Sequence, residues 1–152
     1  MKAVLQRVKE ASVTINGKLH SSIGEGLLIL LGVGPDDGQP QIEYLARKII
    51  NMRIFYDEQG KFNHSLLDVG GEALVVSQFT LFADCKKGNR PSYGRAAPPD
   101  LANDVYEKFV SHLEGQLQGR VKTGVFAADM KVALLNDGPV TISLDTAELL
   151  TS

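Results

Sequence analysis

The feature that most constrains this chain is the run of residues 74–82, whose sequence is LVVSQFTLF. Its first three residues are apolar and two of them are β-branched, which predicts a strand buried on both faces. Ser77, Gln78 and Thr80 then interrupt the apolar run. A buried hydroxyl or amide without a partner costs about 1–3 kcal/mol. The run therefore predicts a core strand that ends either in a local hydrogen-bond network or at a ligand pocket.

The length and composition predict one globular domain spanning residues 1–152. The chain is 43% hydrophobic and 22% charged, which is enough to form a core and gives no signature of disorder. A single cysteine excludes an internal disulfide framework. No run approaches the length of about 18 apolar residues that a membrane helix needs, and residues 1–15 lack an apolar signal core. We expect a cytoplasmic protein with no membrane partner.

Turn residues and apolar periodicity predict a series of strands and two helices packed on a sheet; the fold class that we expect is α/β, with a mostly antiparallel, barrel-like sheet. Asn16-Gly17 is a strong hairpin signal, and the first third of the chain is predicted to be a β-meander. Pro40 and Pro98-Pro99 suit the first turns of two helices, the second of which has an apolar face that begins at Leu101. The predicted strands are residues 2–8 and 11–15 (as one strand or two), 18–23, 27–33, 53–56, 74–82, 121–126, 130–135 and 140–144.

No motif in the sequence indicates a cofactor or a metal. Gly32-Val33-Gly34 lacks the third glycine of a dinucleotide fingerprint and the Gly-Lys-Ser/Thr of a Walker loop, so we expect a plain turn there. His64 and His112 have no cysteine or acidic partners at ligand spacing. Both histidines are therefore predicted to be surface or packing residues.

Residues 85–95 form a basic segment that contains Lys86, Lys87, Arg90, Arg95 and Tyr93. It fits a mobile, solvated loop that limits aggregation. It equally fits a contact with a nucleic-acid backbone, with the tyrosine available for stacking on a base. Because the net charge of the chain is −2, any nucleic-acid contact must come from such a local patch.

Residues 136–141, NDGPVT, lie between the last two predicted strands. An ordinary hairpin turn is one interpretation. The other is a cis Gly138-Pro139 unit, because an X-Pro bond adopts the cis form at modest cost and glycine tolerates unusual backbone angles. Such a unit directs two carbonyl oxygens the same way and offers them to an ammonium group.

The whole chain resembles the D-aminoacyl-tRNA deacylases. Five short motifs occur in the family's order and spacing, and none departs from its pattern. They are Gln6-Arg7-Val8, Ser77-Gln78-Phe79-Thr80-Leu81, Lys87-Gly88-Asn89-Arg90-Pro91-Ser92, Phe126-Ala127-Ala128-Asp129-Met130 and Asn136-Asp137-Gly138-Pro139-Val140-Thr141.

The resemblance implies a homodimer that hydrolyses the ester between a D-amino acid and the 3′ end of tRNA, and that also clears glycine mischarged on alanine tRNA. It implies that Ser77, Gln78, Phe79 and Thr80 line the pocket. It further implies that Gly138 and Pro139 reach into the partner's pocket and exclude L-amino acids, while Arg7 braces them. Phe126 and Met130 match positions beside the terminal adenine. Lys86, Lys87 and Arg90 are then the candidate tRNA-binding residues.

The chemistry leaves three interpretations open. Thr80 or Ser77 is a possible nucleophile but lacks a histidine or lysine at triad spacing, and Cys85 is a possible thiolate beside two lysines. We favour hydrolysis in which the RNA supplies a hydroxyl and the protein orients a water. In that scheme no acidic residue is predicted to bind the substrate ammonium group. The alternative of another class is a non-catalytic nucleic-acid-binding dimer.

Overall fold

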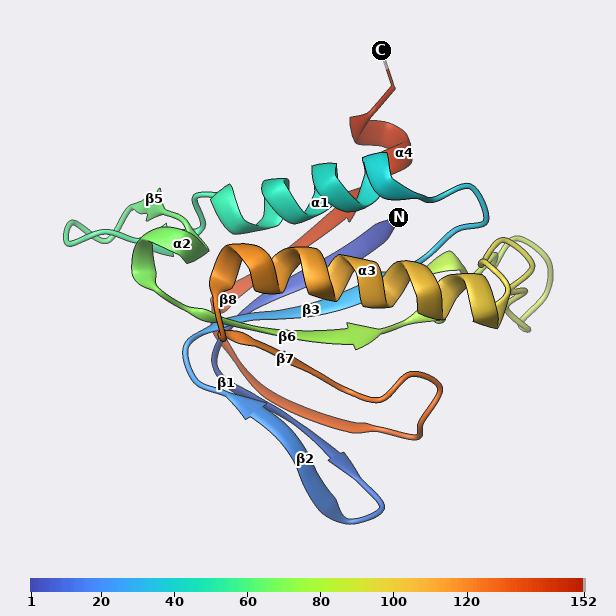
Figure 1. Ribbon diagram of the computed structural model, residues 1–152, viewed down its shortest axis with the longest axis horizontal. Helices are drawn as coiled ribbons and strands as arrows, with labels where there is room; N and C mark the ends of the chain where they lie inside the picture. Colours follow the sequence, from blue (N-terminus) through green and yellow to red (C-terminus); the bar gives the residue numbers. More distant parts are fainter. Residues whose placement is uncertain (152) are drawn as a thin grey trace.

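Two long helices cover one face of a strongly curved sheet in the computed structural model, which describes residues 1–151 (Figure 1). The long helices are α1 (Gln39–Asn51) and α3 (Pro99–Leu117). Two further helices among the described residues are single turns, α2 (Leu66–Val69) and α4 (Thr146–Leu149). The strands are β1 (Lys2–Ile15), β2 (Lys18–Ile23), β3 (Gly26–Gly32), β4 (Phe55–Tyr56), β5 (Phe62–His64), β6 (Glu72–Ser77), β7 (Val121–Thr123) and β8 (Lys131–Asp145).

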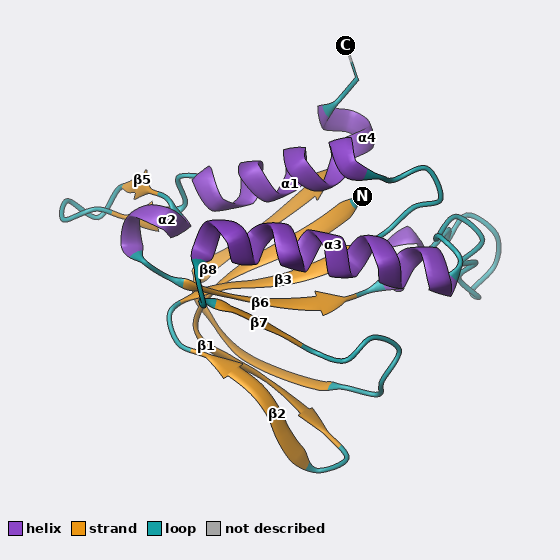
Figure 2. Ribbon diagram, in the orientation of Figure 1, coloured by secondary structure: helices purple, strands orange, loops and turns teal. Residues whose placement is uncertain are grey.

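Strand β1 organises the main sheet, whose order is β2-β1-β3-β6-β7 with β8 also paired to β1. The first half of β1 pairs with β3 and its second half with β2, while β8 follows β1 along nearly its whole length. These pairings are antiparallel, whereas β3–β6 and β6–β7 are parallel. The two ends of the sheet approach each other where Ser21 Oγ donates a 2.7 Å hydrogen bond to the Thr123 carbonyl. The result is a nearly closed barrel, most easily followed in the strand colouring of Figure 2.

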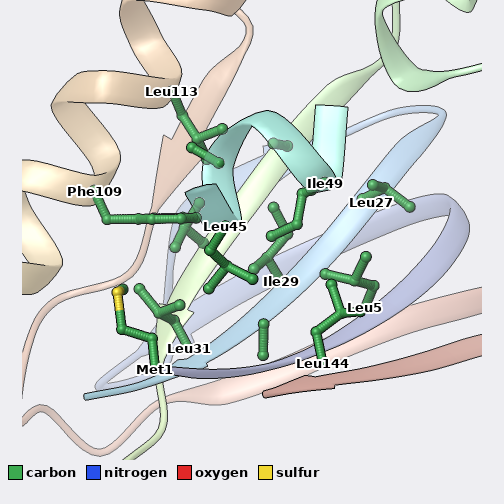
Figure 3. Packing of buried hydrophobic residues seen from close by; sticks show 14 of the residues in the cluster. Met1, Leu5, Leu27, Ile29, Leu31, Leu45, Ile49, Phe109, Leu113 and Leu144 are labelled. Carbon is green, nitrogen blue, oxygen red and sulfur yellow. The ribbon is translucent and has the colours of Figure 1, made fainter. Parts of the chain in front are cut away.

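Two apolar clusters lie on opposite faces of the sheet because successive strand residues point to opposite sides. Leu27, Ile29 and Leu31 of β3 face the helices, where they pack with Leu45 of α1 and Phe109 of α3 (Figure 3). The second cluster fills the barrel and contains Val8, Ala11, Val13, Ile23, Leu28, Leu74 and Val76. Strand β6 is therefore buried on both faces, as residues 74–76 predict.

The α/β class, the barrel-like sheet and the two long helices agree with the sequence-based prediction, and several element boundaries do not. Residues 2–15 form one strand, which is one of the two predicted alternatives. Strand β1 lies between β2 and β3, so the prediction of a meander in the first third is wrong. The predicted strand 121–126 ends at Thr123. Leu101 is 36% exposed, so the buried face of α3 begins with Ala102 and Val105 instead of Leu101.

The largest correction concerns residues 131–145, which form the single strand β8 rather than two strands joined by a hairpin. Gln6 pairs with Thr141 and Val8 pairs with Asn136, so both halves of β8 lie along the same partner strand. Between these two pairs lie one residue of β1, Arg7, and four residues of β8, so residues 137–140 bulge out of the ladder. The Asn-Asp-Gly-Pro segment is thus a bulge supported by β1.

Candidate functional site

A cavity of about 710 Å³ opens where β6 ends. Its walls come from the end of β6, from the 3-10 turn Phe79–Phe82 that follows, from the start of α3 and from the segment leading into β8. The lining residues are Val76, Ser77, Gln78, Phe79, Tyr93, Ala96, Ala97, Pro98, Pro99, Ala102, Phe126, Ala127, Ala128, Asp129, Met130 and Val132. The structure thus brings three residues of the Ser-Gln-Phe-Thr run together with Phe126 and Met130.

The strand ends at Ser77 because the chain turns at Gln78, whose amide N–H donates to the Leu31 carbonyl at 2.7 Å. The Gln78 Nε2 then donates to Thr80 Oγ1 at 2.5 Å. The polar run is therefore partly a local network, and Thr80 belongs to that network rather than to the cavity wall. The prediction of a strand through residue 82 is wrong, because the 3-10 turn leaves Phe79 54% exposed at the mouth of the cavity.

The Gly32-Val33-Gly34 segment makes room for this turn. A Cβ on Gly32 would stand 3.1 Å from the Gln78 carbonyl oxygen and from the Phe82 ring, and one on Gly34 would stand 3.2 Å from the same ring. Both distances are shorter than ordinary van der Waals contact. The two glycines therefore allow the Phe82 ring to seat against β3, which fixes the turn that carries Phe79 and Thr80.

The opposite wall of the cavity is the segment between β7 and β8. Ala127 has a φ of +66°, which is uncommon for a residue with a Cβ. Asp129, which the sequence did not single out, also lines the cavity. Its carboxylate is exposed and paired with Lys131 Nζ at 3.0 Å, which leaves it only partly available to a substrate ammonium group.

The basic segment is a loop that two backbone hydrogen bonds close at its base. The Asp84 N–H donates to the Ser92 carbonyl at 2.7 Å and the Ser92 N–H donates back to the Asp84 carbonyl at 2.9 Å. The Tyr93 ring makes an edge-to-face contact with Phe79, with 5.1 Å between ring centroids. The aromatic of the loop thus reaches the mouth of the cavity.

The basic residues of the loop divide into two groups. Lys86, Lys87 and Arg90 are exposed on the loop. Arg95 lies in a separate hollow that also contains Asp36 and Asp145. Neither group lines the cavity.

Arg7 supports the bulge of β8 from beneath. Its side chain is buried, and its Nε donates to the Asp137 carbonyl at 3.0 Å while Nη1 donates to the Ile54 carbonyl at 2.8 Å. The guanidinium lies 4.2 Å from the centre of the Tyr56 ring. Beside the bulge, the pKa of Lys9 is raised by its hydrogen bond to Glu25 and by the nearby charge of Asp137.

Gly138 and Pro139 do not line the cavity of their own chain. Their peptide bond is cis. In the sheet, Arg7 is paired with Leu27 and Ser77 with Leu31. Leu27 and Leu31 are four positions apart on β3, a distance of about 13 Å along a strand. The cavity and the bulge are two separate features of one chain.

The remaining candidates contribute no catalytic cluster within residues 1–151. The free thiol of Cys85 is exposed on the basic loop, and His64 lies 4.0 Å from Asp68, away from the cavity. This part of the chain contains no group of three or more metal-ligating side chains. None of its helices combines the length and apolarity needed to cross a bilayer.

Comparison with known proteins gives consistent matches over nearly the whole chain. The family model described as D-Tyr-tRNA(Tyr) deacylase matches residues 4–145. A D-aminoacyl-tRNA deacylase of Thermosipho africanus is 56% identical over 98% of this chain and 99% of its own length. One from Chlorobaculum tepidum is 54% identical over 96% of this chain and 97% of its own length.

Two solved structures share the fold. The c-Myc DNA Unwinding Element Binding Protein superposes with a TM-score of 0.91 at 45% identity, covering 95% of this chain and 98% of the other. A structure described as a probable eukaryotic D-amino acid tRNA deacylase gives a TM-score of 0.82 at 15% identity, covering 94% and 97%. The second match shows likeness of fold alone.

Proposed function

The chain belongs to the D-Tyr-tRNA(Tyr) deacylase family of aminoacyl-tRNA ester hydrolases, and we propose that its reaction takes place in the cavity at the end of β6. The substrate is a D-amino acid esterified to the 3′-terminal adenosine of tRNA. The observation that carries this proposal is the meeting of Ser77, Gln78 and Phe79 with Phe126 and Met130 around one cavity. Its volume of about 710 Å³ is of the size that holds a ligand as large as an aminoacylated nucleoside.

The chemical demand on the protein is modest because the aminoacyl ester is already activated. Positioning the ester and directing donors at the developing oxyanion supply most of what the reaction needs. Thr80 Oγ1 already accepts a hydrogen bond from Gln78, and no histidine or lysine side chain is bonded to it within residues 1–151. We therefore assign the assisting hydroxyl to the RNA, and to the protein the orientation of the attacking water.

Chiral selection is assigned to the Gly138-Pro139 bulge of a second copy. The bulge lies away from its own cavity, so it reaches a cavity only by belonging to another subunit. The carbonyls of the bulge then accept from the substrate ammonium group and leave no room for an L side chain. Glycine has no side chain to be rejected, so glycine mischarged on alanine tRNA is also a substrate.

Two features of the surface around Arg7 support contact with a second copy there. The Arg7 Nη2 is buried and lacks a hydrogen-bond partner among residues 1–151, a state that costs about 1–3 kcal/mol. Tyr56 and Phe62 stack on each other beside it, and each ring is about half exposed. Another subunit would satisfy both features if it offered an acceptor to Arg7 Nη2 and an apolar surface to the two rings.

The basic loop is assigned to tRNA binding, and the reaction to chiral proofreading in the cytoplasm. The exposed charges of Lys86, Lys87 and Arg90 support contact with phosphates, and Tyr93 contacts Phe79 at the mouth of the cavity. The same loop also fits a dimer that binds nucleic acid without catalysing any reaction. The name of the 45%-identical structural relative describes DNA binding, which gives that alternative its basis.

Hydrolysis of matched D-tyrosyl-tRNA and L-tyrosyl-tRNA separates these functions. We expect release of D-tyrosine and no release of L-tyrosine above the uncatalysed rate. Binding of both RNAs with no release of either amino acid would establish the non-catalytic alternative. Release of both amino acids at similar rates would remove the assignment of chiral selection.

A further inference from the structure

The side chain of Met130 lies across Gly124, a residue outside the motifs that indicate the site. A Cβ built on Gly124 would overlap Met130 Sδ and would stand 3.6 Å from its Cε and 3.9 Å from its Cγ. The thioether therefore occupies the space that any other residue at position 124 would fill.

The backbone at position 124 does not itself require glycine. Its φ lies outside the left-handed region, unlike that of Gly138 or Gly60. Its N–H donates to the Val75 carbonyl at 3.3 Å, as an L-residue following β7 would also do. The absence of a side chain at Gly124 therefore affects the packing of the neighbouring Met130 side chain, and not the backbone conformation.

Met130 is confined on its other sides. It packs against the apolar cluster inside the barrel, which includes Val76 of β6. Its remaining side forms part of the cavity wall. A side chain at position 124 would therefore displace the thioether toward the cavity, because the barrel interior is close-packed.

We propose that Gly124 is a positioning residue that sets how far Met130 projects into the cavity, and so sets the fit of the terminal nucleoside of the substrate. This inference rests on the proposed function for the identity of the ligand. Methionine has three rotatable bonds and a polarisable sulfur that packs well against aromatic rings. With glycine at position 124, the sulfur stands back and leaves the space beside Phe126 open to the nucleobase.

The test is a double-mutant cycle between Gly124→Ala and Met130→Ala. Gly124→Ala is expected to raise the KM for D-aminoacyl-tRNA about tenfold with kcat changed less than about twofold, because overpacking acts on binding. The double variant should match Met130→Ala alone, since there is no longer a thioether to displace. The control is Gly115→Ala, an exposed helical position where a Cβ meets nothing within 4 Å.

Two further measurements keep the inference separate from the proposed function. The Met130 ε-methyl signal in a 13C NMR spectrum should shift in Gly124→Ala, and adenosine should bind more weakly than to wild type. Inactivity of the wild-type protein toward every aminoacyl-tRNA would refute the function while leaving these readouts intact. Additive effects in the cycle, or an unmoved methyl signal, would refute the role of Gly124.

Loss of stability in Gly124→Ala also decides the matter. A double variant with the melting temperature of Met130→Ala alone would support the contact with Met130. A double variant that lies below Met130→Ala by as much as Gly124→Ala lies below wild type would show that position 124 serves the fold alone.

Discussion

The Nε of Arg7 lies 3.0 Å from the carbonyl oxygen of Asp137, although 130 residues separate the two in the chain. The contact links a buried arginine of β1 to the first residue of the bulge in β8. The guanidinium is held from its other side by the Ile54 carbonyl, 2.8 Å from Nη1. The buried Arg7 guanidinium therefore supports the bulge that carries Gly138 and Pro139.

Substitution of Gly138 tests the importance of the bulge geometry. Gly138 has a φ of +130°, and a Cβ there would stand 2.9 Å from Arg7 Nη2 and from Val140 Cγ2. We expect Gly138→Ala to lower kcat/KM for D-aminoacyl-tRNA about tenfold, because a displacement of about 1 Å already impairs positioning. The matched control is Gly60→Ala, where φ is +74° and the surrounding space is open. Equal activity of the two variants, measured by deacylation, would remove the bulge from the reaction.

Neutralisation of the basic loop tests its role in binding phosphates. Lys86→Gln with Lys87→Gln should weaken binding of D- and L-aminoacyl-tRNA equally, and should reduce the slope of log K against log salt concentration by about 0.7–0.9 for each phosphate that the variant no longer neutralises. Lys18→Gln with Lys48→Gln removes the same charge from exposed positions outside the loop. Affinity titrations over a range of salt concentrations provide the measurement. Identical salt slopes for the two double variants would exclude the loop from the tRNA site.

The source of the assisting hydroxyl is tested from the protein side and from the RNA side. Thr80→Ala should retain measurable turnover because Thr80 Oγ1 is engaged with Gln78 rather than with a base. A tRNA ending in 2′-deoxyadenosine should be hydrolysed at least about 100-fold more slowly, the low end of what acid–base assistance contributes. Mass spectrometry of the protein during turnover tests the opposing mechanism. An acyl group on Ser77, Thr80 or Cys85 would establish covalent catalysis.

Tyr106 links the stability of the fold to pH. Its hydroxyl is buried and donates to the Val75 carbonyl at 2.9 Å. Burial, with a smaller contribution from the charge of Glu107, raises the pKa of Tyr106 to about 12. The phenol of the unfolded chain loses its proton near pH 10, so stability is complete below that pH and falls as the pH rises toward 12.

Urea unfolding at pH values from 8 to 11 measures this effect. Wild type should lose stability more steeply than Tyr106→Phe above pH 10. The variant itself should be about 1 kcal/mol less stable at pH 8 because it lacks the hydrogen bond. Parallel profiles for the two proteins would show that Tyr106 does not titrate with unfolding.

Local patterns in the sequence predict much of the fold. Asn16-Gly17, the prolines that begin the two long helices and the apolar run 74–76 each act within a few residues, and the structure agrees with all three. The boundaries that were wrong depend on distant partners. Residues 136–141 resemble a hairpin turn until β1 is known to pair with both halves of β8.

The same distinction holds for the site. The motifs indicate Ser77, Phe126 and Met130, and the structure places all three around one cavity. No local signal indicates that Gly32 and Gly34 make room for Phe82, that Asp129 faces the cavity or that Gly124 accommodates Met130. These relations join residues that are neighbours only in the folded chain, although Gly124 and Met130 are six positions apart.

The central claim is that one copy of the chain supplies the cavity and another supplies the bulge. Mixing Gly138→Ala subunits with subunits that carry Ser77→Ala and Gln78→Ala tests it directly by deacylation of D-tyrosyl-tRNA. In a heterodimer with shared sites, one site combines an intact cavity with an intact bulge, and the other combines the two defects. Because half of randomly mixed dimers are heterodimers, activity should return to about a quarter of the wild-type value. If each cavity used the bulge of its own chain, no site would be intact, and a mixture no more active than its separate components would contradict the account.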